Sequence, residues 1–307
     1  MRLLTALTLF LAACSSPSVE GSAWMEHEAM RVARSEHPAA VLDGEIVVLG
    51  GFVVSGLGRV SVTTSVEAYD PTNDVWRDLP ELPEPRHHLM AAVVDQALFA
   101  LGGHAESGEA TNSVWELVDD AWVARASIPV PVGAGAAVEL DGSLYLVGGT
   151  PNGGFHRYDP ARDTWETLPS PSSREHLAAV SHAGEVWAIG GRWQGAAFDT
   201  TEVFSVEEGV WREGPRLIDA RSGFGATVVD DVIWVGGGEV FDPLMALTSV
   251  EVLRDGSWAP GADLPFGLHG NPLVSVGGRV YLPGGSTRPG GVDNQGSMIS
   301  LGDITDG

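Results

Sequence analysis

Residues 141–149 read DGSLYLVGG, a turn dipeptide followed by an apolar run and two glycines. Asp-Gly favours the primed turns that join antiparallel strands, and a short apolar run rich in branched and aromatic residues is typical of a buried strand. The run and its glycine pair recur six times, so the chain has an internal repeat that determines its fold. The six copies are EIVVLGG (45–51), ALFALGG (97–103), SLYLVGG (143–149), EVWAIGG (185–191), VIWVGGG (232–238) and RVYLPGG (279–285).

A tryptophan precedes each glycine pair at a nearly constant distance. Trp24 lies 27 residues before Gly51, and the next five intervals are 27, 27, 26, 27 and 27 residues. The distance from a glycine pair to the following tryptophan varies more, which places the variable loop there. A small-residue apolar stretch precedes each turn, and a further strand such as 65–70 follows the glycines. Each repeat therefore predicts four antiparallel strands, which is the blade of a β-propeller.

The repeats resemble the kelch motif over residues 22–302. The resemblance rests on the glycine pair, on an aromatic residue four positions before its second glycine in five of the six units, on the trailing tryptophan and on a Pro-rich link such as 79–83. It implies an all-β fold, a six-bladed kelch-type β-propeller. Trp24 has no glycine pair before it, and Gly285 has no tryptophan after it. We therefore expect the N-terminal segment to supply the outer strand of the last blade and close the ring, so that no blade is left open.

The start of the chain predicts export. Arg2 precedes an apolar run that is too short to span a bilayer as a mature helix. The run ends in Leu11-Ala12-Ala13-Cys14, which resembles a bacterial lipobox, whose cysteine is lipidated; the alternative is an ordinary signal peptide with a chance cysteine. We expect the protein to be anchored by lipid in the cell envelope, in the outer membrane or at the cell surface rather than in the inner membrane. The expected segments are a lipoprotein signal peptide (1–13), the lipidated Cys14 with a flexible tether (14–21), the propeller (22–302) and a short C-terminal tail (303–307).

Composition excludes several classes of partner and site. The formal net charge is −24, and the 307 residues include no lysine. Such a charge repels phosphate backbones, so we expect no nucleic-acid partner. Cys14 is the only cysteine, which excludes a disulfide within the chain and a zinc site built on paired thiolates. We expect a monomer.

Candidate binding residues gather where the innermost strands begin. These strands surround the propeller axis, so the residues before them crowd one mouth of the channel. In units three and six, apolar residues at 130–133 and 266–268 replace the arginine that the other units have. The candidates are the arginines Arg34, Arg86, Arg174 and Arg221, the histidines His37, His87, His88, His176 and His269, and Glu36.

Two interpretations of these arginines remain open. They belong to the repeat pattern and would then tie blade to blade, or they form a focus of positive charge in an acidic protein. Such a focus would select a sugar acid, a carboxylate-ended peptide or an acidic segment of a partner. We expect a non-catalytic binding module for an unknown protein or a small anionic or carbohydrate ligand.

Enzyme and metal sites have weaker support. Copper oxidases with kelch-like propellers need a tyrosine joined to a cysteine, and Cys14 lies in the lipobox. Sialic acid mutarotases are six-bladed periplasmic kelch proteins that transfer protons between a carboxylate and a basic residue. A carbohydrate-active enzyme of that kind, using Glu36 with Arg34 or Arg86, is therefore the alternative function. Neighbouring residues of a strand point to opposite sides, so we expect His87 and His88 not to share a metal ion, and we expect no cofactor.

Overall fold

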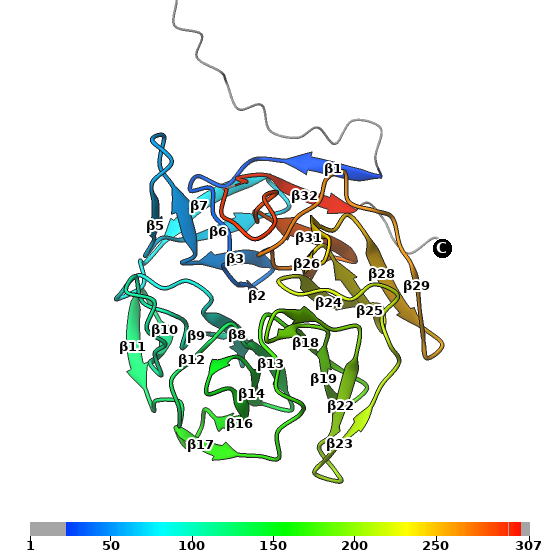
Figure 1. Cartoon of the computed structure of the whole chain (residues 1–307). Coiled ribbons are helices and arrows are strands. Elements are labelled where there is room, and N and C mark those ends of the chain that lie inside the picture. The colour runs from blue at the N-terminus through cyan, green and yellow to red at the C-terminus, as the bar shows by residue number, and fades with distance from the viewer. Residues whose placement is uncertain (1–22, 294, 302–307) are drawn as a thin grey trace, which may run out of the picture.

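The computed structural model describes residues 23–293 and 295–301, and these form six four-stranded antiparallel sheets arranged around an axis (Figure 1). The segments expected as signal peptide, lipidated Cys14, tether and C-terminal tail lie outside the described residues. The part of the chain that the structure describes contains no helix long and apolar enough to cross a membrane. The predicted all-β, six-bladed propeller is thus confirmed.

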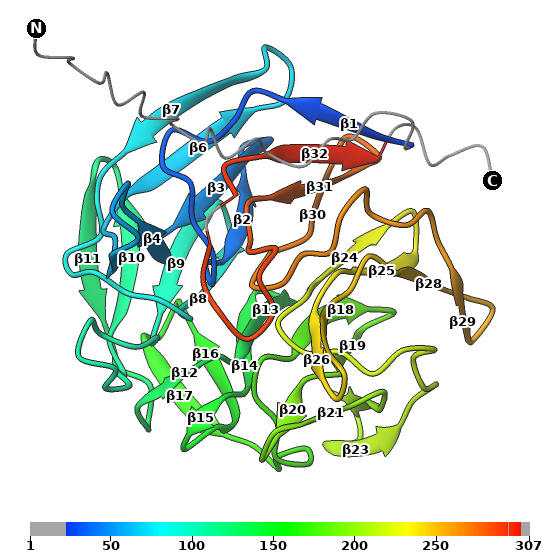
Figure 2. The ribbon, with the colours of Figure 1, turned by 45° about the horizontal axis from the view of Figure 1, so that its top comes forward.

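Each blade runs from an inner strand at the axis to an outer strand at the rim (Figures 1 and 2). Blade 1 has β2 (Ala39–Leu42), β3 (Glu45–Leu49), β6 (Val66–Asp70) and β7 (Val75–Leu79). Blade 2 has β8 (Met90–Val94), β9 (Ala97–Leu101), β10 (Val114–Val118) and β11 (Ala121–Arg125). Blade 3 has β13 (Ala136–Leu140), β14 (Ser143–Gly148), β16 (Gly154–Asp159) and β17 (Thr164–Thr167).

The remaining blades repeat this order. Blade 4 has β18 (Ala178–His182), β19 (Glu185–Ile189), β22 (Thr201–Ser205) and β23 (Val210–Glu213). Blade 5 has β24 (Gly225–Val229), β25 (Val232–Gly236), β28 (Val250–Arg254) and β29 (Ser257–Pro260). Blade 6 has β30 (Val274–Val276), β31 (Arg279–Pro283), β32 (Met298–Leu301) and, outermost, β1 (Trp24–His27).

Of the four remaining strand pairs, three are hairpins within the connections that follow the glycine pairs, and one joins such a connection to the segment just before the inner strand of blade 3. They are β4 (Phe52–Val54) with β5 (Val60–Val62), β12 (Val132–Gly133) with β15 (Thr150–Pro151), β20 (Arg192–Trp193) with β21 (Ala196–Ala197), and β26 (Glu239–Phe241) with β27 (Leu244–Ala246).

The ring closes through the N-terminal strand. β1 pairs antiparallel with β32, with Trp24 opposite Leu301 and His27 opposite Met298. Two segments from opposite ends of the sequence therefore complete one blade, and the predicted closure is confirmed. The joint gives the last blade its fourth strand and covers the edge of β32.

The trailing tryptophans tie each blade to its neighbour, which explains their regular spacing. The indole N–H of Trp76, on the outer strand of blade 1, donates to the carbonyl of Glu28, just after β1, at 2.8 Å. The same bond recurs in every blade, from an outer-strand tryptophan to the connection that leaves the preceding blade. The six donor–acceptor pairs are Trp24–Ala262, Trp76–Glu28, Trp122–Pro80, Trp165–Ala126, Trp211–Pro169 and Trp258–Pro215, at 2.6 to 3.1 Å.

The glycine pairs serve a second link between blades. The amide of Gly51 donates to the carbonyl of Arg86 in the next blade at 2.8 Å. A Cβ on Gly50, which has φ +58°, would lie 2.4 Å from the carbonyl oxygen of Arg86 in the next blade. Only glycine fits such a backbone and such a close approach, so the repeated glycines mark where neighbouring blades touch.

Candidate functional site at the mouth of the axial channel

Six backbone hydrogen bonds form a closed ring around the axis. The amide of Glu36 donates to the carbonyl of Gly270 at 2.8 Å, and each blade repeats this bond to the blade before it. All six ring residues have positive φ, between 50° and 62°. This left-handed conformation is uncommon for residues other than glycine, and it holds one residue of each blade at the channel mouth. The ring residues are Glu36, His88, Ala134, His176, Gly223 and Gly270.

Two further positions of each blade surround this ring. The residue before each ring residue pairs through the backbone with the residue that follows the glycine pair of the same blade. Together the three positions define the mouth. The outer pairs are Ser35 with Phe52, His87 with His104, Gly133 with Thr150, Glu175 with Arg192, Ser222 with Glu239, and His269 with Ser286.

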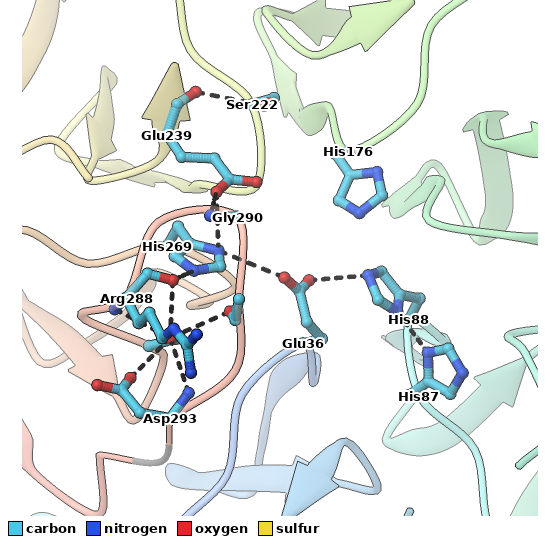
Figure 3. Close-up of polar contacts among 12 residues, drawn as sticks. Glu36, His87, His88, His176, Ser222, Glu239, His269, Arg288, Gly290 and Asp293 are labelled. Atoms are coloured by element: carbon cyan, nitrogen blue, oxygen red, sulfur yellow. Dashed lines mark hydrogen bonds and ion pairs between the residues drawn. The ribbon is translucent and has the colours of Figure 1, made fainter. Parts of the chain in front are cut away.

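Glu36 stands between two histidines from the blades on either side (Figure 3). Its carboxylate lies 3.1 Å from Nε2 of His88 and 3.5 Å from Nδ1 of His269. Burial raises the pKa of Glu36, but the charge of His88 and the hydrogen bonds to His269 and His88 outweigh it and hold that pKa well below its usual range. Burial lowers the pKa of His269, yet the bond to Glu36 and the charges of Glu36 and Glu239 raise it to about 9. Glu36 and His269 therefore form an ion pair at neutral pH.

Arg192 is the arginine that lies in the mouth. Its guanidinium contacts Glu175 at 3.1 Å and Glu239 at 2.9 Å, and it donates to Nε2 of His176 at 3.1 Å. Burial, and then the charge of His88, hold the pKa of His176 well below its usual range, so this imidazole is neutral and accepts the bond.

Four residues of the mouth were not predicted from the sequence: Arg192, Glu175, Glu239 and His104. Three of these four residues directly follow a glycine pair, as in Gly190-Gly191-Arg192. That position was the available signal: the glycines follow the second strand of each blade, and the next residue pairs through the backbone with the residue before the ring, which brings it into the mouth.

Blade 2 places histidine at all three of its mouth positions. His88 has φ +51° and lies outside a strand, so its Nδ1 comes within 2.5 Å of the Nδ1 of His87. The expectation that these neighbours point apart assumed a strand, and the left-handed backbone removes that reason. His104 stacks on His87 with ring centroids 5.3 Å apart. Burial, and then the charge of His88, lower the pKa of His87 to about 3, and burial, more than any charge, also lowers that of His104.

Three of the four predicted arginines point into their own blades rather than into the mouth. The buried guanidinium of Arg34 donates to the carbonyls of Gly50 and Ser65 at 3.0 and 2.8 Å, and it pairs with the buried carboxylate of Glu67. Arg174 with Glu202 and Arg221 with Glu251 repeat the arrangement. A guanidinium has five N–H donors, and these partners occupy most of them. The prediction that Arg34, Arg174 and Arg221 contact a ligand is therefore corrected: their side chains form hydrogen bonds and ion pairs within their own blades.

Arg86 also lies beneath the surface, with different partners. Arg86 is 4% exposed. Its guanidinium pairs with Glu84 and lies 5.2 Å from the ring centroid of Trp115. Trp115 stands at the strand position that Glu67 occupies in blade 1. In blade 2, a cation–π contact between Arg86 and Trp115 replaces the Arg34–Glu67 ion pair of blade 1. The prediction that Arg86 lies in the mouth is therefore corrected as well.

The mouth opens into an axial cavity of about 180 Å³. Glu36, His88 and His176 line it, and below them its wall is made largely of small inner-strand residues such as Ala91 and Ala137. His37 lies one residue beyond Glu36 and also lines the cavity. Burial, and then the charge of Arg34, lower its pKa to about 3, so this imidazole is neutral. The cavity thus has a polar mouth and a narrow apolar lower part.

Comparisons with known proteins agree with this architecture. The sequence model of the Kelch motif matches residues 33–83 and 173–218. The solved structure described as "Structure of YjhT" superposes with a TM-score of 0.74, covering 89% of this chain and 95% of that one at 15% identity. The chain is a six-bladed β-propeller that contains Kelch motifs.

Curated kelch proteins align along most of this propeller. Kelch-like protein terF of Aspergillus terreus is 27% identical in an alignment of length 284 that covers 82% of this chain and 61% of that protein. Alpha-scruin of Limulus polyphemus is 25% identical over 88% of this chain and 33% of its own length. Kelch-like protein 35 of Mus musculus is 31% identical over 61% of this chain and 32% of its own length. The chain spans between about a third and three fifths of these relatives.

Proposed function

We propose that this propeller is a binding module whose ligand occupies the channel mouth, and that the ligand is a polyhydroxylated molecule of the carbohydrate class. One observation carries the proposal: charged acceptors and donors lie together at the mouth of a single cavity. Glu36 accepts, while Arg192 and the protonated His269 donate. Few, convergent polar groups around a pre-formed cavity are typical of a small-molecule site.

The charge balance favours a neutral sugar over a strongly anionic ligand. Glutamates of the same blades neutralise the charges of Arg34, Arg174 and Arg221. Glu239 neutralises much of the positive field of Arg192. Sugar hydroxyls donate and accept at once, which matches a mouth of mixed polarity better than a carboxylate does.

A thermal-shift panel tests the proposal. A ligand that binds only the folded protein raises its melting temperature. The panel compares D-galactose and N-acetyl-D-glucosamine with D-galacturonate and a short acidic peptide. We expect a shift with a neutral sugar. A shift with only the acidic peptide would support a protein partner instead and contradict the carbohydrate assignment.

A second candidate is an enzyme that transfers protons on a sugar, of the kind that the mutarotases represent. Its supporting observation is that the carboxylate of Glu36, which lines the cavity, lies 3.5 Å from the charged His269 at the mouth. A base and an acid placed together are the requirement for ring opening of a sugar. Measuring interconversion of α- and β-anomers by NMR, with and without the protein, separates this candidate from simple binding.

Export and lipid anchoring complete the proposal. The lipobox-like residues 11–14 support both. We expect the wild-type protein to partition with membranes after expression in a Gram-negative host, and the Cys14→Ser variant to lose the acyl mass from its N-terminus. Recovery of both proteins in the cytoplasm would contradict export.

A further inference from the structure

The three histidines of blade 2 form a cluster that the proposed function does not use as a unit. His87 and His104 exchange backbone hydrogen bonds of 3.1 and 2.8 Å, which puts both side chains on one side of the pair. Their rings stack at an interplanar angle of 24°. His88 closes the group, with its ring centroid 5.8 Å from that of His104. We propose that His87, His88 and His104 bind one transition-metal dication of the zinc class.

The donor atoms are close enough to share an ion. One ring nitrogen from each histidine lies within 4.8 Å of the others. Two nitrogens on one zinc ion, each at about 2.0–2.1 Å, are at most about 4 Å apart, so small ring rotations bring the three atoms to the ion. Three imidazoles leave a fourth tetrahedral position open, as catalytic zinc sites do.

Glu36 supplies the outer support that such a site needs. Its carboxylate faces Nε2 of His88 at 3.1 Å, while Nδ1 of the same ring faces His87. A carboxylate that accepts from one nitrogen fixes the tautomer and directs the lone pair of the other toward the ion. In His88, Nε2 thus donates to Glu36, and Nδ1 is left to bind the ion.

His104 has an unpaired buried nitrogen in the described structure. Its Nδ1 is buried and has no hydrogen-bond partner among residues 23–293 and 295–301. The ring packs on Gly133, where a Cβ would lie 2.4 Å from that nitrogen, so the neighbouring blade leaves room for the imidazole. An unpaired buried acceptor is costly, and a ring rotation toward the cluster would exchange it for a metal bond.

Charge and ligand type select the class of ion. His87, His88 and His104 offer only imidazole nitrogens, which bind metal ions as neutral ligands. Glu36 places a carboxylate beside the cluster, 3.1 Å from His88. All-imidazole sites suit zinc, copper, nickel and cobalt, whereas calcium and magnesium take oxygen ligands.

Calorimetric titration with Zn²⁺ tests the inference on the purified protein after dialysis against a chelator. His104→Phe and His87→Phe keep ring volume and remove the nitrogens. His182→Phe is the matched control, because His182 is similarly buried but lies at the end of β18, outside the mouth. We expect one Zn²⁺ per chain in the wild type and the control, at least a tenfold loss of affinity in His104→Phe and His87→Phe, and no binding of Ca²⁺. Equal affinity in all four proteins, or no binding by the wild type, would overturn the proposal.

X-ray absorption of the zinc-loaded wild type is a readout that needs no variant to fold. Three imidazole ligands at about 2.0 Å are expected, and one or two would overturn the assignment. The titration contains no sugar, so it fails or succeeds separately from the proposed carbohydrate binding.

Discussion

The backbone amide of Glu36 donates a 2.8 Å hydrogen bond to the carbonyl of Gly270, across the joint between the first and last blades. A Cβ on Gly270 would lie 2.7 Å from the carboxyl carbon of Glu36. Because Gly270 has no side chain, there is room in the mouth for the carboxylate of Glu36. Ring closure and site geometry depend on the same contact.

Gly270→Ala should destabilise the protein more than backbone strain alone. A left-handed alanine costs roughly 1–2 kcal/mol, and displacement of Glu36 adds to this. Gly277→Ala is the control, because Gly277 has the same φ of +58° and no atom within 4 Å of an added Cβ. Urea unfolding should show a larger loss for Gly270→Ala, and equal losses would show that the contact with Glu36 does not matter.

The closing strand should be essential to stability. Trp24 is 3% exposed and joins the core shared by blades 5 and 6. We expect Trp24→Ala to lower the free energy of unfolding by about 3–5 kcal/mol, the cost of truncating a buried tryptophan. Chemical denaturation measures it. A loss below about 1 kcal/mol would mean that β1 contributes little to closure.

The internal arginines should behave as buried ion pairs. Removing one partner of such a pair costs about 3–5 kcal/mol, whereas replacing both by apolar residues is often neutral. Arg221 and Glu251 are 0% and 1% exposed. Arg221→Met should therefore destabilise strongly, and Arg221→Met with Glu251→Leu should recover much of the loss. No recovery in the double variant would indicate that the backbone contacts of Arg221 dominate.

His269 should give the protein an alkaline stability limb. Its folded pKa of about 9 lies above the ordinary value of 6.5, so its contribution is complete below pH 6.5 and is lost as pH rises through 9. The depressed pKa values of His37 and His87 act in the opposite direction, because their contribution is lost as pH falls below 6.5. Melting temperature against pH should therefore fall above neutrality, and Glu36→Gln should reduce that fall. An unchanged alkaline limb in Glu36→Gln would contradict the ion pair.

The repeats and the closure could be predicted because both are local patterns with fixed spacing. The role of the arginines could not, since it depends on a partner at variable distance. Glu67, Glu202 and Glu251 follow the first glycine of their pair by 17, 12 and 14 residues. Each stands two residues after Ser65, Thr200 or Ser249, and in the described units without such a glutamate the position holds Trp115, His156 or Ile299.

The mouth was predicted only in part for a similar reason. Glu36, His88 and His176 belong to the inner-strand approach and were found there. Arg192 and His104 come from a different segment of their blades, and backbone pairs across the mouth bring them in. The left-handed conformation of His88 accompanies the ring of hydrogen bonds between blades. These bonds join residues far apart in the sequence, so no local sequence pattern predicts them.

The imidazole NMR spectrum of the wild-type protein, recorded before and after the panel sugar that most raises its melting temperature, tests the location of the site most directly. We predict that signals of His88, His176 and His269 shift, while those of His27, His156 and His182, away from the mouth, do not. Shifts confined to the second group, or no panel sugar that stabilises the protein, would contradict a carbohydrate site at the mouth.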